Sequence, residues 1–307
     1  MTGVIEGFAT IILVIALGAF VAHVGVVDLS AQRTLSRLSF TVASPALLVT
    51  VLQDTDVSDV ISKGLIANGV SVVAVVVIWA VLAIVVLRRD LADTVIGALC
   101  AGYVNAGNLG LPIAAYVLGD AALVAPALLM QLLVLQPLAL TLLDVGVAER
   151  RLSWWEVASR PVRNPLTVAT LIGLGLSATE SRLPRLVDDP LQLVGAMAVP
   201  SMLIAYGISL RLGPKPGTGG GPKQLGTLVA LKQVVQPLVA YLVARYLLGL
   251  DGVELLAVTI LAALPTAQNV FVIASRYERS VVLARDAIFA STLLSVPTIA
   301  VISALLT

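Results

Sequence analysis

The sequence has one cysteine and one histidine in 307 residues. Cys100 alone excludes an internal disulfide and a multi-cysteine metal site, and His23 alone cannot form a histidine cluster. Charged residues make up 12% of the chain, against about 25% in soluble domains. The net charge is +1, so no basic surplus indicates a nucleic-acid partner. Redox chemistry, zinc chemistry and nucleic-acid binding are therefore poorly supported, and no cofactor is expected.

Apolar residues are what the chain has in excess. They make up 59% of it, and the mean hydropathy is +1.02. The first apolar run, Phe8–Val27, has no preceding Lys or Arg, and it is interpreted as a span and not as a signal peptide. A bilayer core about 30 Å thick needs roughly 20 apolar residues in helix, so we predict an all-α membrane protein of about ten spans. The predicted spans are Ile5–Val26, Leu35–Leu52, Leu65–Leu87, Thr94–Leu118, Leu123–Val145, Pro165–Ala178, Leu191–Leu210, Leu225–Leu248, Leu255–Ser275 and Val281–Leu306.

The distribution of Lys and Arg predicts the orientation. With the N-terminus outside, 14 of these residues fall in inner loops or at inner helix ends. The outer side keeps only Lys63, Arg182, Arg185 and Arg245. Short cytoplasmic loops retain positive charge, so this bias predicts an even number of spans with both termini outside the cell membrane.

Two pairs of prolines recur at nearly the same spacing. Pro45 and Pro200 are 155 positions apart, and Pro112 and Pro265 are 153 apart. Five spans per repeat is an odd number, so the second copy would enter the membrane from the opposite side. We therefore predict a first five-helix repeat at 1–147, a cytoplasmic linker at 148–164 and an inverted second repeat at 165–307. Chance is the alternative, because proline is tolerated in membrane helices.

The stretch NAGNLGLPIAAY interrupts the fourth predicted span. Gly107 and Gly110 loosen the backbone before Pro112, so the helix is expected to break there and a half-helix to start at Pro112. Exposed backbone in hydrocarbon requires protein or a polar cavity around it, and helix starts favour anions. The ninth predicted span has a similar interruption at Pro265. The predicted substrate-binding residues on the two breaks are Asn105, Asn108, Gly110, Pro112, Pro265, Thr266, Gln268 and Asn269.

Several polar residues allow two interpretations. A single membrane asparagine more often joins two helices than binds a substrate, although four clustered amides favour a site. Tyr116, included among the candidates, and Tyr206 could form site walls or simply pack. Gln131 and Gln136 are equally ambiguous. Lys232, the remaining candidate, could hold an anion or extend to the cytoplasmic surface. No acidic residue falls clearly in the middle of a span, which disfavours a carboxylate-based proton or sodium antiporter.

The segments NAGNLGLPIA and AALPTAQNVFVIASRY, together with SPALLVTVLQ and AVPSMLIAYGISL, resemble the auxin efflux carrier family. This family includes plant PIN-type auxin exporters and bacterial malate or malonate permeases. The resemblance covers essentially the whole chain and implies a fold related to bile-acid/sodium symporters. It implies a scaffold of spans one, two, six and seven, through which a homodimer could form, and a moving transport unit of spans 3–5 and 8–10. By this likeness Asn105 matches the substrate-contacting crossover asparagine, and Asn269 lies at the second crossover.

The sequence therefore favours a secondary transporter, an efflux carrier or permease that moves a small organic anion by alternating access. A carboxylate such as malate, malonate or an auxin-like acid is the expected substrate. A sodium-coupled symporter of the bile-acid type and a membrane sensor without transport activity are the alternatives. An enzyme is disfavoured, because one His, one Cys and no central carboxylate offer neither a nucleophile with its base nor a metal cluster. Transport direction and coupling ion stay open.

Overall fold

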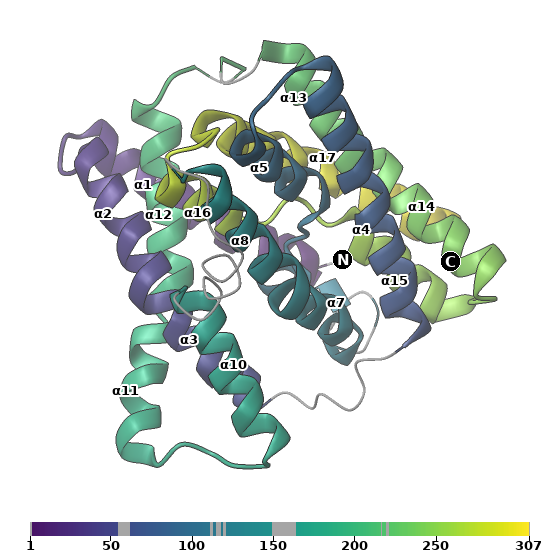
Figure 1. Ribbon diagram of the computed structural model, residues 1–307, viewed down its shortest axis with the longest axis horizontal. Coiled ribbons are helices and arrows are strands. Elements are labelled where there is room, and N and C mark those ends of the chain that lie inside the picture. The colour runs from purple at the N-terminus through teal and green to yellow at the C-terminus, as the bar shows by residue number, and fades with distance from the viewer. Residues whose placement is uncertain are drawn as a thin grey trace.

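The computed structural model describes residues 2–54, 62–110, 113–114, 118, 121–148, 164–215, 217–218 and 221–306, without the side chains of 2–8, 121–122 and 125. This part of the chain is helical and contains no named strand (Figure 1). In the first half the helices are α1 (Thr2–His23), α2 (Leu29–Leu38), α3 (Ser44–Gln53), α4 (Lys63–Val81), α5 (Leu91–Gly102), α7 (Ala125–Met130) and α8 (Gln136–Gly146). In the second half they are α10 (Pro165–Ala178), α11 (Arg185–Gly195), α12 (Ala198–Leu212), α13 (Gly221–Ala230), α14 (Gln236–Leu242), α15 (Gly252–Ala263), α16 (Asn269–Tyr277) and α17 (Val281–Leu306).

Wider π-helical turns directly follow five of these helices: η1 (Ser39–Ala43), η3 (Leu82–Val86), η7 (Gln131–Leu135), η9 (Leu231–Val235) and η10 (Val243–Leu247). A further π-helical turn, η4 (Ala106–Gly110), stands apart from α5, and a short 3₁₀ segment, η6 (Ala121–Val124), precedes α7. Three of the π turns are followed at once by a helix with proline in its first turn, at Pro45, Pro137 and Pro237. Proline has no N–H to donate, so a bulged turn before it relieves the helix of a hydrogen bond that it could not form.

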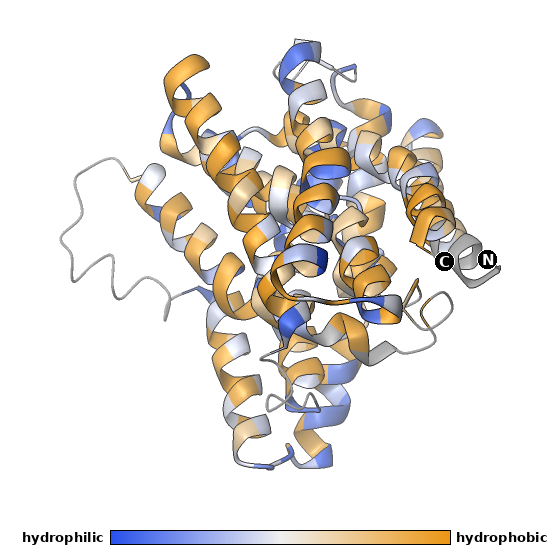
Figure 2. Cartoon of the chain, turned by 90° about the vertical axis from the view of Figure 1, so that its right-hand side faces the viewer, coloured by the Kyte–Doolittle hydropathy of each residue, from blue (hydrophilic) through white to orange (hydrophobic). Residues whose placement is uncertain are grey.

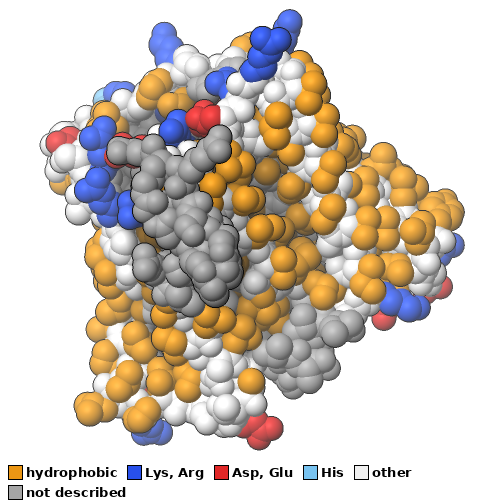
Figure 3. All heavy atoms as spheres, viewed as in Figure 1, with side chains coloured by type: hydrophobic (Ala, Val, Ile, Leu, Met, Phe, Trp, Pro, Cys, Tyr) orange, Lys and Arg blue, Asp and Glu red, His pale blue; other side chains and the backbone are white. Residues whose placement is uncertain are grey.

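Among the described residues, six uninterrupted helical stretches are long and apolar enough to cross a membrane: Leu29–Gln53, Lys63–Val86, Pro126–Gly146, Arg185–Leu212, Gly221–Leu247 and Val281–Leu306. Four shorter apolar helices accompany them, at Ala9–His23, Leu91–Gly102, Pro165–Ala178 and Gly252–Ala263. The ribbon is apolar along the middle of most helices and polar near many of their ends (Figure 2). The face shown in Figure 3 is covered mainly by apolar side chains, with Lys and Arg gathered mostly near its top. This is the surface expected of a multi-pass membrane protein.

The helices form two groups. The first helix group comprises α1, α2, α3, α10, α11 and α12, and the second comprises α4, α5, α7, α8 and α13 to α17. In the first, α1 packs on α12, and α3 packs on both α10 and α11. In the second, α4 packs on α5, α14 and α15, while α17 packs on α15 and α16. In Figure 1 the first group occupies the left side, and α4, α13, α14 and α15 form the right side.

Glycines allow α1 and α12 to approach closely. A Cβ built on Gly207 would lie 2.1 Å from the carbonyl oxygen of Ile15, and one on Gly18 would lie 2.4 Å from that of Ile204. Both contacts are with backbone, which cannot move aside as a flexible side chain could. Close backbone approach at small residues is a common basis of helix association in lipid, where hydrophobic burial contributes little. The two glycines therefore allow the close packing of α1 on α12.

We expect Gly207→Ala to separate α1 from α12 and to destabilise the protein by about 1–3 kcal/mol, the usual cost of overpacking. Thermal unfolding of the detergent-purified protein measures this change. Gly175→Ala, in α10, is the matched control, because a Cβ there meets no atom within 4 Å. Equal melting temperatures for the two variants would show that the α1–α12 contact tolerates a methyl group.

Candidate functional site

Two helices are interrupted deep inside the protein, and the interruptions touch. Helix α5 ends at Gly102 and α15 ends at Ala263, and the chain resumes a helical course at Ala106 and Asn269. The backbone amide of Asn105 donates to the Pro265 carbonyl oxygen at 2.9 Å, and the backbone amide of Ala267 donates to the Tyr103 carbonyl oxygen at 3.1 Å. The two segments thus form a short antiparallel bridge between Val104 and Thr266. This pairing satisfies backbone groups that a membrane interior would otherwise leave without partners.

The second interruption lies at Pro265, as the sequence predicts, but the first lies earlier than predicted. Extended backbone occurs at Tyr103–Asn105, seven or more residues before Pro112, and a π-helical turn follows directly. The Asn105 side chain explains the early restart. Its Oδ1 accepts from the Asn108 amide at 3.3 Å, as a helix cap does, and its carbonyl accepts from the Gly110 amide at 3.0 Å. Pro112 and Tyr116 lie outside the described residues.

Side chains connect the two interruptions as well. Asn105 Nδ2 donates to Gln268 Oε1 at 2.7 Å, which joins candidates from both halves of the chain. Thr266 Oγ1 donates to the Cys100 carbonyl at 2.6 Å, and the Thr266 amide donates to Ser291 Oγ at 3.1 Å. Gly110 packs against the second interruption, because a Cβ there would lie 3.1 Å from Leu264 Cδ1. Asn105, Thr266 and Gln268 are all at most 2% exposed.

A cavity of about 290 Å³ lies between the interruptions and the first helix group. This volume is near the lower limit for small-molecule sites, about 300 Å³. One wall is apolar and comes from α3, α10 and α12, whereas the opposite wall carries most of the polar groups. The polar lining residues are Ser44, Tyr103, Asn105, Asn108, Gln131, Gln136, Gln268 and Asn269, and the apolar ones include Leu47, Leu48, Val51, Leu166, Val199 and Met202.

Three glutamines on the polar wall keep hydrogen-bonding atoms without a partner among the described residues. These atoms are Gln131 Oε1, Gln136 Nε2 and Gln268 Nε2. All three side chains are at most 2% exposed, and the Tyr103 hydroxyl donates to the other end of Gln136 at 3.2 Å. A buried polar atom without a partner costs about 1–3 kcal/mol, so such atoms mark places where a polar ligand or water is expected.

The structure brings together only some of the predicted site residues. Asn105, Asn108, Gln268 and Asn269 line the cavity. Gly110, Pro265 and Thr266 lie behind it, at the place where the two interrupted segments pair, which we call the crossing. The sequence left Gln131 and Gln136 ambiguous, and both line the cavity. Tyr206 does not line it: its ring packs edge-on against Phe271, with centroids 5.4 Å apart.

Lys232 is neither a surface residue nor part of the cavity lining. Its side chain is 1% exposed, so the alternative that it extends to the cytoplasmic surface is wrong. The Nζ atom donates to Gln236 Oε1 at 2.6 Å and to the Ala262 carbonyl at 3.0 Å. Gln236 Nε2 in turn donates to the Gly102 carbonyl at 3.4 Å. The lysine therefore lies at the C-terminal ends of α5 and α15, where helix dipoles favour a cation.

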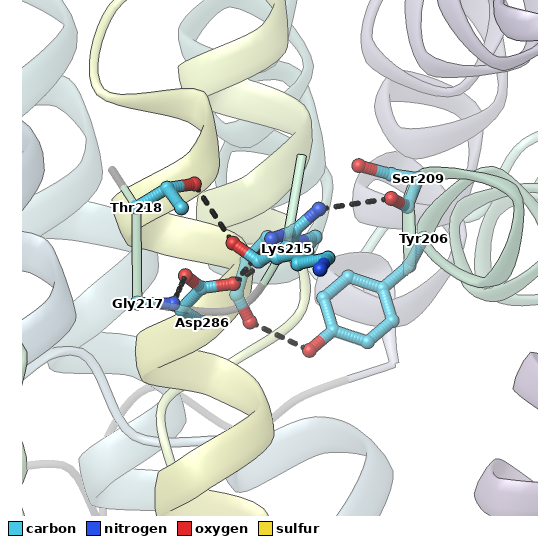
Figure 4. A network of polar contacts seen from close by, with 7 residues as sticks. Tyr206, Ser209, Lys215, Gly217, Thr218 and Asp286 are labelled. Carbon is cyan, nitrogen blue, oxygen red and sulfur yellow. Dashed lines mark hydrogen bonds and ion pairs between the residues drawn. The ribbon is translucent and has the colours of Figure 1, made fainter. Parts of the chain in front are cut away.

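Arg285 and Asp286 form a second buried charged group, which the sequence pattern did not indicate (Figure 4). Arg285 was placed with the inner-surface charges, but it lies within α17 and is fully buried beside Asp286, which is 2% exposed. Arg285 Nη2 lies 2.7 Å from Asp286 Oδ1, and its Nη1 donates to the Ser209 carbonyl at 3.0 Å. The Tyr206 hydroxyl donates to the Arg285 carbonyl, and Asp286 Oδ2 accepts from the Gly217 amide at 2.6 Å (Figure 4). Adjacent opposite charges at the start of an apolar run were the available signal.

Paired helix breaks beside a cavity with one polar wall, within a bundle of apolar helices, are features of membrane transporters. A family profile described as membrane transport protein matches residues 3–148 and 148–303, so the chain belongs to this family, the auxin efflux carrier family that its motifs resemble. The chain is also 26% identical over 264 residues to a Rhizobium meliloti (strain 1021) protein named "Putative malonate transporter". That match covers 84% of this chain and 81% of the relative. Its family makes the protein a membrane transporter and not an enzyme.

Proposed function

We propose that this protein is a secondary carrier that moves a small organic anion across the cell membrane by alternating access. A carboxylate such as malonate, malate or an auxin-like acid is the proposed substrate. The observation that carries the proposal is the cavity at the two touching helix breaks, where buried glutamine amide groups have atoms without a partner among the described residues. The name of the Rhizobium relative favours malonate as the first acid to test.

The proposed architecture has ten spans in two inverted five-helix repeats, with both termini outside. The six long helices and four shorter ones agree in number with this arrangement. In it the first helix group is the scaffold, and the second is the transport unit that carries both breaks. The cavity lies between the two groups, with Leu48 and Met202 on one side and Gln131 and Gln268 on the other. This position supports movement of one group against the other as the transport step. A homodimer would form through the scaffold.

Transport assays test this proposal directly. In proteoliposomes that contain the purified protein and are preloaded with unlabelled acid, we expect uptake of external labelled malonate, malate or indole-3-acetate to exceed uptake by protein-free vesicles. Exchange of this kind needs no knowledge of the coupling ion, because the preloaded acid drives it. Failure of all three acids to enter faster than in protein-free vesicles would reject the organic-anion carrier.

A further inference from the structure

The charge of the ligand can be inferred from the charges that surround the cavity. Among the described residues that line it, none is acidic or basic. The polar wall offers only hydroxyl and amide groups. A carboxylate that enters this site exchanges water for neutral hydrogen-bond donors, and each additional negative charge makes that exchange less favourable. The lining therefore limits how much ligand charge the site can hold.

Buried charge elsewhere in the described part of the chain adds up to one positive unit. Its buried charged side chains are Lys232, Arg285 and Asp286. Arg285 and Asp286 form an ion pair at 2.7 Å, so together they contribute no net charge. The side-chain hydrogen bonds of Lys232 go to an amide oxygen and a backbone carbonyl, both of them neutral acceptors. In its protonated form, Lys232 is therefore the one buried cation without a paired carboxylate in the described part of the chain, and it lies within the transport unit.

Lys232 is linked to the crossing by hydrogen bonds through Gln236 to Gly102, one residue before the extended segment at Tyr103. The cavity lies against that extended segment and against the start of α16 at Asn269. A helix start carries about half a positive charge and favours an anion. Charges inside a membrane protein are weakly screened. The helix start at the cavity and the lysine behind it can therefore both favour one negative charge on the ligand.

The free atoms on the polar wall fit such a ligand. Gln136 Nε2 and Gln268 Nε2 are donors that suit carboxylate oxygens, whereas Gln131 Oε1 and Asn269 Oδ1 are acceptors that suit a hydroxyl or amide hydrogen. A ligand with one carboxylate and one neutral hydrogen-bond donor would satisfy both kinds of atom. Malonate with both carboxylates ionised has no hydrogen to give to Gln131.

We propose that the cavity selects a ligand with a single negative charge, and that Lys232 supplies the balancing charge from behind the crossing. A dicarboxylic acid would accordingly bind as its singly protonated form. This inference rests on the proposed function, because it concerns the substrate of the same site.

Three molecules of similar size and different charge test the proposal: malonate, malonamate and malonamide. At about pH 8 they carry two, one and no negative charges, because carboxylates ionise near pH 4 and amides do not. We expect malonamate to compete with labelled substrate, or to raise the melting temperature, at concentrations at least about tenfold lower than either of the others require. Malonate that competes as well as malonamate at this pH would overturn the proposal.

Substitution of the lysine provides the second measurement. Lys232→Gln should reduce the advantage of malonamate over neutral malonamide at least about tenfold, whereas Lys232→Arg should preserve it. A residue with only a structural role would change the binding of both ligands equally, and that result would reject the role of Lys232. If none of the three molecules binds but another acid exchanges in proteoliposomes, this inference fails and the carrier function stands. If no acid exchanges, both fail.

Discussion

Asp286→Asn is expected to lower the free energy of unfolding by about 3–5 kcal/mol, because it leaves a buried arginine without its counter-charge. Arg285 is fully buried, and its Nε and Nη2 both donate to Asp286 Oδ1, at 2.8 and 2.7 Å. An asparagine has one carbonyl oxygen, so it can accept from the Gly217 amide or from Arg285 but not from both, and the expected loss combines the missing charge with the loss of one of these contacts. Thermal or denaturant unfolding of the purified protein in detergent measures it.

Two controls test whether the loss comes from leaving a charge buried without its partner. Asp54→Asn breaks the ion pair between Asp54 and Arg182, in which the aspartate side chain is 54% exposed and the arginine side chain 79% exposed. This change should lower the free energy of unfolding by no more than about 1 kcal/mol. The double variant Arg285→Met, Asp286→Leu removes both buried charges and should be more stable than Asp286→Asn alone. A double variant less stable than the single one would contradict this account, as would equal shifts for Asp286→Asn and Asp54→Asn.

Asn105→Ala is expected to reduce substrate affinity by roughly 10- to 100-fold, which corresponds to about 1.4–2.8 kcal/mol. The asparagine joins the two breaks through its 2.7 Å bond to Gln268, and it caps the turn that begins at Ala106. Without it, Gln268 loses the partner that holds its side chain at the cavity wall, and a buried oxygen is left unsatisfied. Exchange in proteoliposomes, measured over a range of acid concentrations, reports the change in affinity.

The matched control replaces a buried amide outside this cavity. Gln233 is 4% exposed, lies on η9, does not line the cavity, and has no hydrogen-bond partner for either side-chain atom within the described structure. Gln233→Leu should therefore leave substrate affinity unchanged and should not lower stability, because no hydrogen bond is lost. If Asn105→Ala binds the acid as well as this control does, the cavity at the crossing is not the substrate site.

Composition and proline positions predicted the general class of fold. Apolar runs indicate membrane helices whatever their neighbours, and Pro265 breaks its helix because proline removes a backbone donor. The predicted start of a half-helix at Pro112 lies outside the described residues, whereas the interruption at Tyr103–Asn105 was not predicted, because its position depends on a partner distant in sequence. The Asn105 amide pairs with the Pro265 carbonyl, and no pattern local to 105–112 contains that bond.

The polar residues were harder to assign because the same side chain can bind another helix, a ligand or water. Lysine in a membrane protein is usually found near the membrane surface, and only the tertiary structure shows that Gln236 and the Ala262 carbonyl accept hydrogen bonds from Lys232. Gln131 and Gln136 could not be assigned, since which way an amide faces is decided by packing. Arg285 and Asp286 were overlooked because a charged pair near a helix end is usually exposed.

The backbone pairing of Tyr103–Asn105 with Pro265–Ala267 also limits how the protein can move. These hydrogen bonds join one interrupted segment to the other, and neither of them involves α3 or α12. The paired segments beside the cavity thus form one rigid unit made from both halves of the polypeptide. Movement of one interrupted segment without the other would leave backbone carbonyl and amide groups without partners inside the membrane. The two segments should therefore move together relative to the apolar wall formed by α3, α10 and α12.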